Sequence, residues 1–377
     1  MRKIIIILFA LAISPFISKG QAKDTLIFKG QLSSWINYNQ SNNNILFGGR
    51  YIPQVNYSND FSKGHQFDIE LSGNFYGNLQ SHSEADGNIK PYRAWTRYST
   101  PQFEIRAGLQ KINFGSATML RPLMWFDQMD PRDPLQLTDG VWGVLGKYYF
   151  LNNANIWLWG LYGNKNTKGW DWAATNSNYP EFGGRIQLPT FIGEAAISYH
   201  HRVADLSDND LGIILPTYSK APENRIGLDA KFDWVIGFWV EGVWINNQKD
   251  LLTLTNQTIL NAGADYTFGI GNGLLAVYEH LIFSADSDPF AFENTNQFSL
   301  FSLSYPMGLF DNVSAMLYYS WDNEKIYSFL NWQRQYNNIS LHLMAYWNPE
   351  TFDLPQQNFQ NNIFGGKGVQ FMFVFNH

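Results

Sequence analysis

FDIELSGNF, residues 67–75, alternates apolar and polar residues along its length. One parity holds Phe67, Ile69, Leu71, Gly73 and Phe75, and the other holds Asp68, Glu70, Ser72 and Asn74. Successive side chains of a β-strand point to opposite faces, so this pattern predicts a strand between an apolar and a polar environment. The same alternation recurs at residues 92–98, 225–232 and 339–347.

Eighteen such segments follow one another along the chain. Their approximate centres are residues 32, 51, 71, 95, 107, 145, 159, 186, 199, 228, 242, 262, 279, 301, 318, 331, 344 and 371. Sixteen strands are the alternative, because the segments near residues 242 and 301 alternate poorly. The intervening connections are tight at 99–102, 191–193, 269–273 and 308–312, and long and polar at 165–181, 207–222, 286–294 and 351–364.

Short turns at one end and long loops at the other are typical of a transmembrane β-barrel. Strands exposed to lipid must close into a barrel, because an open edge would leave backbone groups unpaired. We therefore predict an all-β fold, a transmembrane antiparallel β-barrel of about 18 strands with short periplasmic turns and long extracellular loops. A soluble β-sandwich or propeller also alternates, but such folds do not normally combine 17% aromatic with only 15% charged residues.

The N-terminus, MRKIIIILFALAISPFISKG, has the basic start, apolar run and small residues of a secretory signal peptide. We expect residues 1–20 to be removed and residues 21–377 to form a single barrel domain. Removal takes away three basic residues, leaving 26 − 3 = 23 basic against 32 acidic residues, a net charge of −9. An acidic, exported chain argues against nucleic acid as a partner and favours the outer membrane of a Gram-negative bacterium, among lipid and lipopolysaccharide.

Several arginines fall on the parity that would face the barrel lumen. Arg50, Arg93 and Arg106 are candidates for a basic ladder facing solutes, and such side chains favour anions in pores. If the 99–102 turn pairs residues whose numbers sum to 201, Arg97 lies opposite Glu104 as a cross-strand ion pair. The alternative is that all these charges are paired and have no role in selectivity.

Residues 113–139, NFGSATMLRPLMWFDQMDPRDPLQLTD, form the longest interruption of the strand pattern. Counted from a periplasmic N-terminus, this segment is the third extracellular loop. Its prolines resist strand extension and favour a defined, packed loop. We expect it to fold inward and constrict the lumen.

A resemblance to known proteins rests on this region. The run RAGLQKINFGSA (106–117), then RPLMWFDQMDPRDPLQLTDGV (121–141), then GVLGKYYF (143–150) resembles porin-like barrels of Bacteroidota. It is more distantly similar to eighteen-stranded substrate-specific, phosphate-selective and alginate-export porins. The resemblance implies that Arg106 and Gln110 are wall residues. It also implies that the loop residues at or near the constriction are Arg121, Asp127, Asp130, Arg132 and Asp133.

The sequence gives weaker support for a metal site or an enzyme active site in the same loop. Asp127, Asp130 and Asp133 offer oxygen ligands for calcium, but their spacing lacks the glycine and glutamate of an EF-hand. The sequence contains no HExxH or GxSxG motif and no cysteine, so we expect neither an enzyme nor a cofactor.

The functional hypothesis is a channel for passive diffusion of small polar or anionic solutes. The alternative is an occluded barrel that serves as an accessory subunit of a larger outer-membrane or export complex, because the apolar segment MLRPLMWF (119–126) could plug the lumen or meet a partner. The last segment, KGVQFMFVFNH (367–377), resembles the aromatic signal read by the barrel-assembly machinery, with a final His as a departure.

Overall fold

The computed structural model describes residues 24–61, 64–81, 85–207, 218–350 and 363–377. The predicted signal peptide and parts of the long loops at 207–222 and 351–364 lie outside the described residues. A single-turn helix, η2, spans Leu252–Leu254. The strands are β1 (Asp24–Asn39), β2 (Asn44–Asp60), β3 (Gln66–Gln80), β4 (Asp86–Ser99), β5 (Phe103–Gln110), β6 (Val141–Tyr149), β7 (Asn155–Leu161), β8 (Glu181–Thr190), β9 (Gly193–Asp205), β10 (Lys220–Asp233), β11 (Gly237–Asn247), β12 (Asn256–Phe268), β13 (Leu274–Asp286), β14 (Thr295–Pro306), β15 (Asp311–Ser320), β16 (Lys325–Gln335), β17 (Ile339–Trp347) and β18 (Lys367–Asn376).

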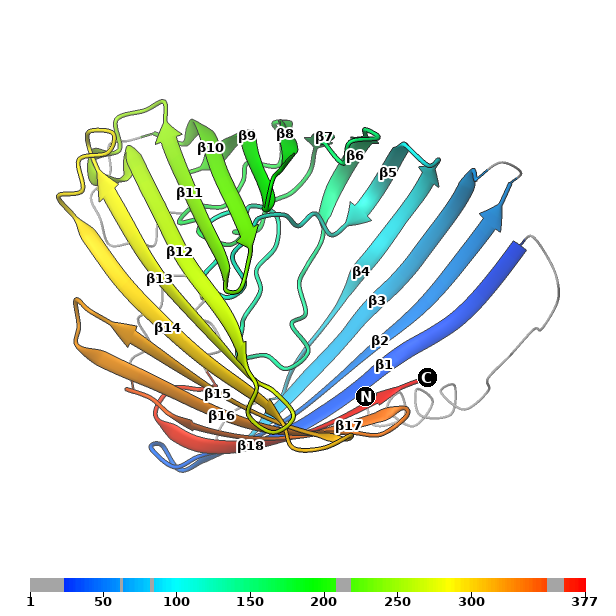
Figure 1. The fold of residues 1–377 in the computed structure, drawn as a ribbon, viewed down its shortest axis with the longest axis vertical. Helices are drawn as coiled ribbons and strands as arrows, with labels where there is room; N and C mark the ends of the chain where they lie inside the picture. The colour runs from blue at the N-terminus through cyan, green and yellow to red at the C-terminus, as the bar shows by residue number, and fades with distance from the viewer. Residues whose placement is uncertain (1–23, 62–63, 82–84, 208–217, 351–362) are drawn as a thin grey trace.

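The strands form one closed antiparallel sheet. Each strand pairs with the next in sequence, and β18 returns to pair with β1, where Ile36 lies opposite Phe371. Figure 1 shows the strands running round a ring in sequence order. Closure leaves no open sheet edge, so the predicted barrel is confirmed with 18 strands rather than 16.

The alternation of side chains separates the two faces of the barrel. On β10, Ile226 and Leu228 are exposed on the outer surface, whereas Arg225 and Asp229 are buried on the lumen side. This arrangement repeats around the sheet and gives a broad apolar outer belt, as a membrane barrel requires. In the described residues, no helix is long and apolar enough to cross a membrane, a finding that does not bear on crossing by strands.

The connections differ at the two ends of the barrel, as expected. The turns at the end that holds Asp24 and His377 are short, for example residues 100–102, 191–192 and 234–236. The connections at the other end include residues 111–140 and 162–180.

The register predicted for the hairpin of β4 and β5 was wrong by two residues. Arg97 lies opposite Arg106, and Glu104 lies opposite Ser99. The cause is a three-residue turn closed by a bond from Thr100 N to the carbonyl oxygen of Phe103 at 2.7 Å. The expected ion pair still forms, because the Glu104 side chain reaches diagonally to Arg97 at 3.7 Å.

Candidate functional site: the constriction

The connection between β5 and β6, residues 111–140, folds into the lumen and is called the inward loop. Figure 1 shows it within the ring of strands, between β5 and β6 in colour. Its apolar side chains, including Ile112, Leu123 and Trp125, are almost completely buried. The expectation of an inward third loop is therefore confirmed.

A single carboxylate on the far wall holds the tip of the inward loop. Glu279 of β13 accepts backbone N–H bonds from Thr118 at 2.8 Å, from Met119 at 3.1 Å and from Leu120. The hydroxyl of Thr118 donates a fourth bond at 2.9 Å. Bonds to an ionised carboxylate are stronger than those between neutral groups, so Glu279 is the main polar anchor of this segment.

Two further wall carboxylates extend this anchorage. Glu241 of β11 accepts N–H bonds from Ala117 at 2.7 Å and Leu123 at 3.3 Å. Asp229 of β10 accepts a bond from the Ser116 hydroxyl at 3.1 Å. Three neighbouring acidic residues of the lumen therefore position the loop rather than face solute.

An apolar core inside the lumen completes the attachment. Phe114 of the loop stacks on Trp159 of β7 at 5.6 Å between ring centroids, and Phe126 meets Trp159 edge to face at 5.3 Å. Trp125 stacks on His200 of β9 at 6.0 Å. The wall residues of this core lie on strands from β6 to β17 and include Leu145, Leu161, Val243, Ile245, Ile259, Leu281, Leu300, Tyr318, Tyr327 and Tyr346. The loop thus covers this side of the lumen.

A second connection, residues 162–180 between β7 and β8, also packs inward. Trp170 stacks on Phe283 of β13 at 6.0 Å and donates its indole N–H to the carbonyl oxygen of Arg121 at 2.8 Å. Asp171 binds Arg202 at 2.9 Å. Sequence reasoning missed this packing, although the run WDW at 170–172 in a polar loop was a signal for it.

Lys168 of this second loop is buried beside Glu181, with Nζ 3.2 Å from the carboxylate. Burial lowers the pKa of Lys168 below that of a free lysine, and the neighbouring carboxylate opposes the shift. The pair fastens the loop to the start of β8.

Two of the predicted wall residues are buried at the base of the inward loop. Arg93 donates to the carbonyl oxygen of Thr138 at 2.8 Å and so binds the end of the loop. Gln110 is completely buried and donates to the carbonyl oxygens of Arg106 at 3.1 Å and Gly143 at 3.0 Å, which joins the end of β5 to β6. Neither side chain faces open lumen.

The charged residues predicted at the constriction are mostly bonded within the loop. Arg121 pairs with Asp127 at 3.4 Å, and both are buried. Arg132 pairs with Asp130 at 2.7 Å. The guanidinium of Arg132 also lies over the rings of Phe329 and Phe364, at 5.5 and 5.1 Å from their centroids.

Asp133 accepts N–H bonds from Leu135 at 3.0 Å and Leu137 at 3.4 Å. Burial raises the pKa of Asp133 above that of a free aspartate, and the Leu135 N–H, the charge of Arg50 and the Leu137 N–H oppose the shift. Asp127, Asp130 and Asp133, the calcium candidates, thus turn to separate partners. Among the residues that the structure describes, no group of three acidic or histidine side chains could hold a metal ion.

The uncovered wall, strands β1 to β6, is rich in cations next to aromatic rings. The Arg50 guanidinium lies next to the stacked rings of Trp35 and Tyr76, at 5.6 and 5.2 Å from their centroids. Arg106 lies over Trp95 at 4.7 Å. Cation–aromatic contacts of this kind hold a guanidinium in place without removing its charge.

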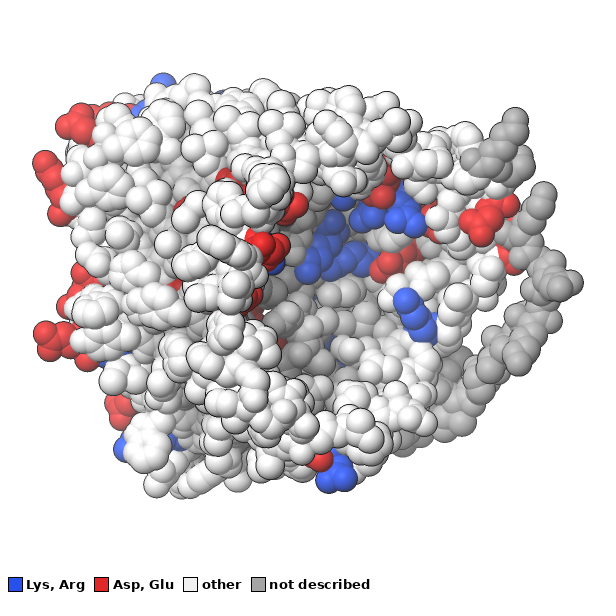
Figure 2. All heavy atoms as spheres, in the orientation of Figure 1, with Lys and Arg blue, Asp and Glu red and all other residues white. Residues whose placement is uncertain are grey.

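Acidic residues neutralise part of this wall. Arg97 binds Asp68 at 2.8 Å, and Arg106 binds Glu104 at 3.1 Å. Glu70 interacts electrostatically with Arg93, Lys29 and Arg106. Figure 2 shows lysine and arginine side chains gathered with a few acidic ones in a hollow, in the area that β3 to β5 occupy in Figure 1.

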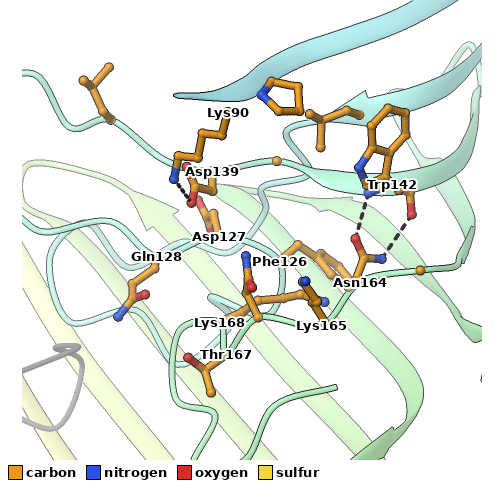
Figure 3. Close-up of a pocket in the computed structure, with 16 residues that line it drawn as sticks. Lys90, Phe126, Asp127, Gln128, Asp139, Trp142, Asn164, Lys165, Thr167 and Lys168 are labelled. Atoms are coloured by element: carbon orange, nitrogen blue, oxygen red, sulfur yellow. Dashed lines mark hydrogen bonds and ion pairs between the residues drawn. The ribbon is translucent and has the colours of Figure 1, made fainter. Parts of the chain in front are cut away.

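A pocket of about 450 Å³ lies where the inward loop meets β4 and the second loop. Figure 3 shows Lys90 paired with Asp139 on one side and Lys165 and Lys168 on the other; the pair of Lys90 and Asp139 measures 2.6 Å. Because these residues lie on the long-loop end of the strands, the pocket is at the predicted extracellular entrance.

Neither a protein family nor a curated protein matches the sequence. Solved structures do match. OccD3 (OpdP) of Pseudomonas aeruginosa is 10% identical, with a TM-score of 0.57 over 95% of this chain and 94% of that one. OccAB1 of Acinetobacter baumannii is 8% identical, with a TM-score of 0.55 over 96% and 99%.

An anion-selective porin from Comamonas acidovorans is 11% identical, with a TM-score of 0.50 over 94% of this chain and 100% of that one. At such low identities the similarity establishes a shared fold. The predicted resemblance to porin barrels is confirmed at that level.

Proposed function

We propose that the protein is an outer-membrane channel through which small polar solutes diffuse passively, with a preference for anions. The observation that carries the proposal is the asymmetry of the lumen. The inward loop covers the wall from β7 to β17 and part of β6. It meets the basic wall of β1 to β6 at Trp35, Tyr76 and Arg93 and otherwise leaves that wall beside the hollow. A solute that crosses the barrel would therefore pass along this basic wall.

The charge balance of that wall supports an anion preference. Arg93 binds the inward loop and Lys90 pairs with Asp139. Inside the strand ends, the remaining cations on the lumen face are Lys29, Arg50, Arg97, Arg106 and Lys147, and the carboxylates are Asp68, Glu70 and Glu104. Five cations against three carboxylates give 5 − 3 = +2. Arg50 lies at ion-pair distance from no carboxylate within the described part of the chain, although its charge interacts with Asp133 of the inward loop, so we infer that it also acts on a passing anion.

The acidic residues on the opposite wall do not counter this preference. Asp229, Glu241 and Glu279 are buried beneath the inward loop and are bonded to it. The loop thus covers these three carboxylates, and the arginines on the same side of the lumen are buried in ion pairs, for example Arg185 with Asp229 at 2.5 Å.

The apolar outer belt supports insertion into a lipid bilayer, and β18 is the strand that we expect the barrel-assembly machinery to recognise. The alternative hypothesis, an occluded accessory subunit, finds no favouring observation. One of the similar structures is described as an anion-selective porin.

Reconstitution into planar bilayers under a KCl gradient tests the proposal. We expect discrete conductance steps and a reversal potential of the sign produced by chloride preference. The variant Arg50→Gln should move the reversal potential toward zero. Lys249→Gln removes an exposed charge from the connection between β11 and β12 and should leave it unchanged. Absence of conductance steps, or a preference for potassium, would refute the proposed function.

A further inference from the structure

Five consecutive short turns carry large apolar residues at their tips. They join β6 to β7, β8 to β9, β10 to β11, β12 to β13 and β14 to β15. The tip residues are Leu151, Phe191, Trp234, Ile270 and Leu309. These five residues are called the apolar rim.

Four of the five rim residues have almost no contact with the rest of the chain, and the fifth, Ile270, is 58% exposed. Leu151 and Leu309 are 92% and 95% exposed, Phe191 is fully exposed, and Trp234 is 84% exposed. Covering a side chain of this size is worth about 1.5–3 kcal/mol relative to leaving it in water. Single exposed apolar residues are ordinary, but a succession on five neighbouring turns indicates a surface that something covers.

Turns on the rest of the same end are more polar. The turn between β4 and β5 is Thr-Pro-Gln at 100–102, and that between β16 and β17 is Tyr-Asn-Asn at 336–338. Phe61, after β2, and Tyr336 are about half exposed, less than Leu151, Phe191, Trp234 and Leu309. The most exposed apolar side chains of this end thus lie on one arc of the barrel. This arc carries much of the wall on which the inward loop packs.

The apolar rim continues the lipid-facing belt without interruption. Phe232 and Phe238, on the outer face of β10 and β11, lead directly to Trp234 at the tip. Near two other turns, aromatic pairs lie edge to face: Tyr148 with Phe150 at 4.9 Å and Tyr266 with Phe268 at 4.8 Å. Aromatic girdles of this kind mark the membrane interface of a barrel.

Strand length supports this position for two of the five rim turns. Strands β6, β7 and β8 contain 9, 7 and 10 residues, whereas β1 to β4 contain 16, 17, 15 and 14. A tilted strand needs about 9–11 residues to cross the apolar layer of a bilayer. These three strands are barely long enough, so the turns that carry Leu151 and Phe191 lie at the edge of that layer.

We propose that the apolar rim is immersed in the inner leaflet of the membrane, at the boundary between headgroups and acyl chains. The polar turns on the remaining arc then face the periplasm, and the solute path leaves the barrel on their side. This inference rests on the proposed membrane-spanning function. It commits to phospholipid as the occupant because the rim is continuous with the lipid-facing belt.

Site-directed labelling can test the immersion, because the 377-residue sequence contains no cysteine. Leu309→Cys and Phe191→Cys report on two turns of the rim, and Asn337→Cys in a polar turn is the matched control. Each variant is labelled with a nitrobenzoxadiazole fluorophore and reconstituted into phosphatidylcholine vesicles without other protein. Quenching is then measured with lipid carrying a nitroxide near the headgroup and with iodide equilibrated across the vesicle.

We expect the two rim labels to be quenched severalfold more by the nitroxide lipid than the Asn337 label, and to be protected from iodide. Rim labels as accessible to iodide as the control would overturn the proposal and indicate a protein partner instead. Conductance of the same labelled variants separates this inference from the proposed function. If the labelled barrels conduct but their rim labels are accessible to iodide, only the proposed immersion is refuted. If the rim labels are immersed but the barrels never conduct, only the proposed channel function is refuted.

Discussion

Replacing Glu279 by alanine should release the tip of the inward loop. The side chain is completely buried, and it accepts three backbone N–H bonds and one hydroxyl bond from Thr118, Met119 and Leu120. Alanine removes the acceptor and leaves these donors without it. Moving the tip into water then lowers its free energy, because water can hydrate its N–H groups.

The magnitude follows from the number of bonds. A hydrogen bond to a charged group contributes about 1.5–3 kcal/mol, so the three backbone bonds contribute about 4.5 kcal/mol at the low end. Each 1.4 kcal/mol is a factor of ten, so the detached state of the tip should become roughly a thousandfold more populated. The apolar core and Glu241 still hold the rest of the loop, so we expect local detachment rather than unfolding.

Single-channel recording is the appropriate assay. Glu279→Ala should show larger conductance with frequent transitions between levels, and Glu279→Gln should lie between it and the native protein because an amide accepts weaker bonds. Glu194→Ala removes a lumen-facing carboxylate that is bonded to Gln187 of β8 and serves as the control. Glu279→Ala channels with native conductance and native noise would refute the assigned anchoring role.

Three further predictions concern the second loop. Gly169 has φ +47°, and an added Cβ would collide with the carbonyl oxygen of Met124, so Gly169→Ala should cost about 1–3 kcal/mol in backbone strain alone and lower the urea midpoint of unfolding. Trp170→Phe loses the bond to Arg121 and should cost about 1 kcal/mol in the same assay, with unchanged midpoints arguing against a packed second loop. Lys168 has a lower pKa in the folded chain than in the unfolded chain, so the unfolded chain binds its proton more tightly. The free energy of unfolding should therefore rise with pH between the lowered pKa and the usual 10.5. Urea titration at several pH values measures this rise, and Lys168→Met should abolish it.

The barrel could be predicted from sequence because its signal is local. One face of each strand contacts lipid and the other faces the lumen, so every second residue lies in the same environment. Residues 67–75 show this in nine positions, and all eighteen predicted centres fall within observed strands. The parity also placed Arg50, Arg97 and Arg106 on the lumen face. The register of β4 and β5 was wrong because it depends on one bond of Thr100 within the turn.

The constriction was predictable in position but not in its contacts. The length of residues 113–139 and their place after the fifth strand predicted an inward loop. Which wall residues hold the loop depends on strands far away in sequence: Thr118 and Glu279 are 161 residues apart. Sequence reasoning therefore assigned no anchoring role to Glu279.

The sequence by itself determined the architecture, the two faces of the wall and the existence of an inward loop, because alternation and loop length are properties of short segments. Only the tertiary structure decided how the lumen is divided. The loop's N–H groups bind Glu241 and Glu279 and the Ser116 hydroxyl binds Asp229, while Arg93 binds the end of the loop and Arg50 packs against Trp35. Charged residues that the sequence pattern does not distinguish thus have different roles. Their partners depend on how the barrel closes and how the loop folds inside it.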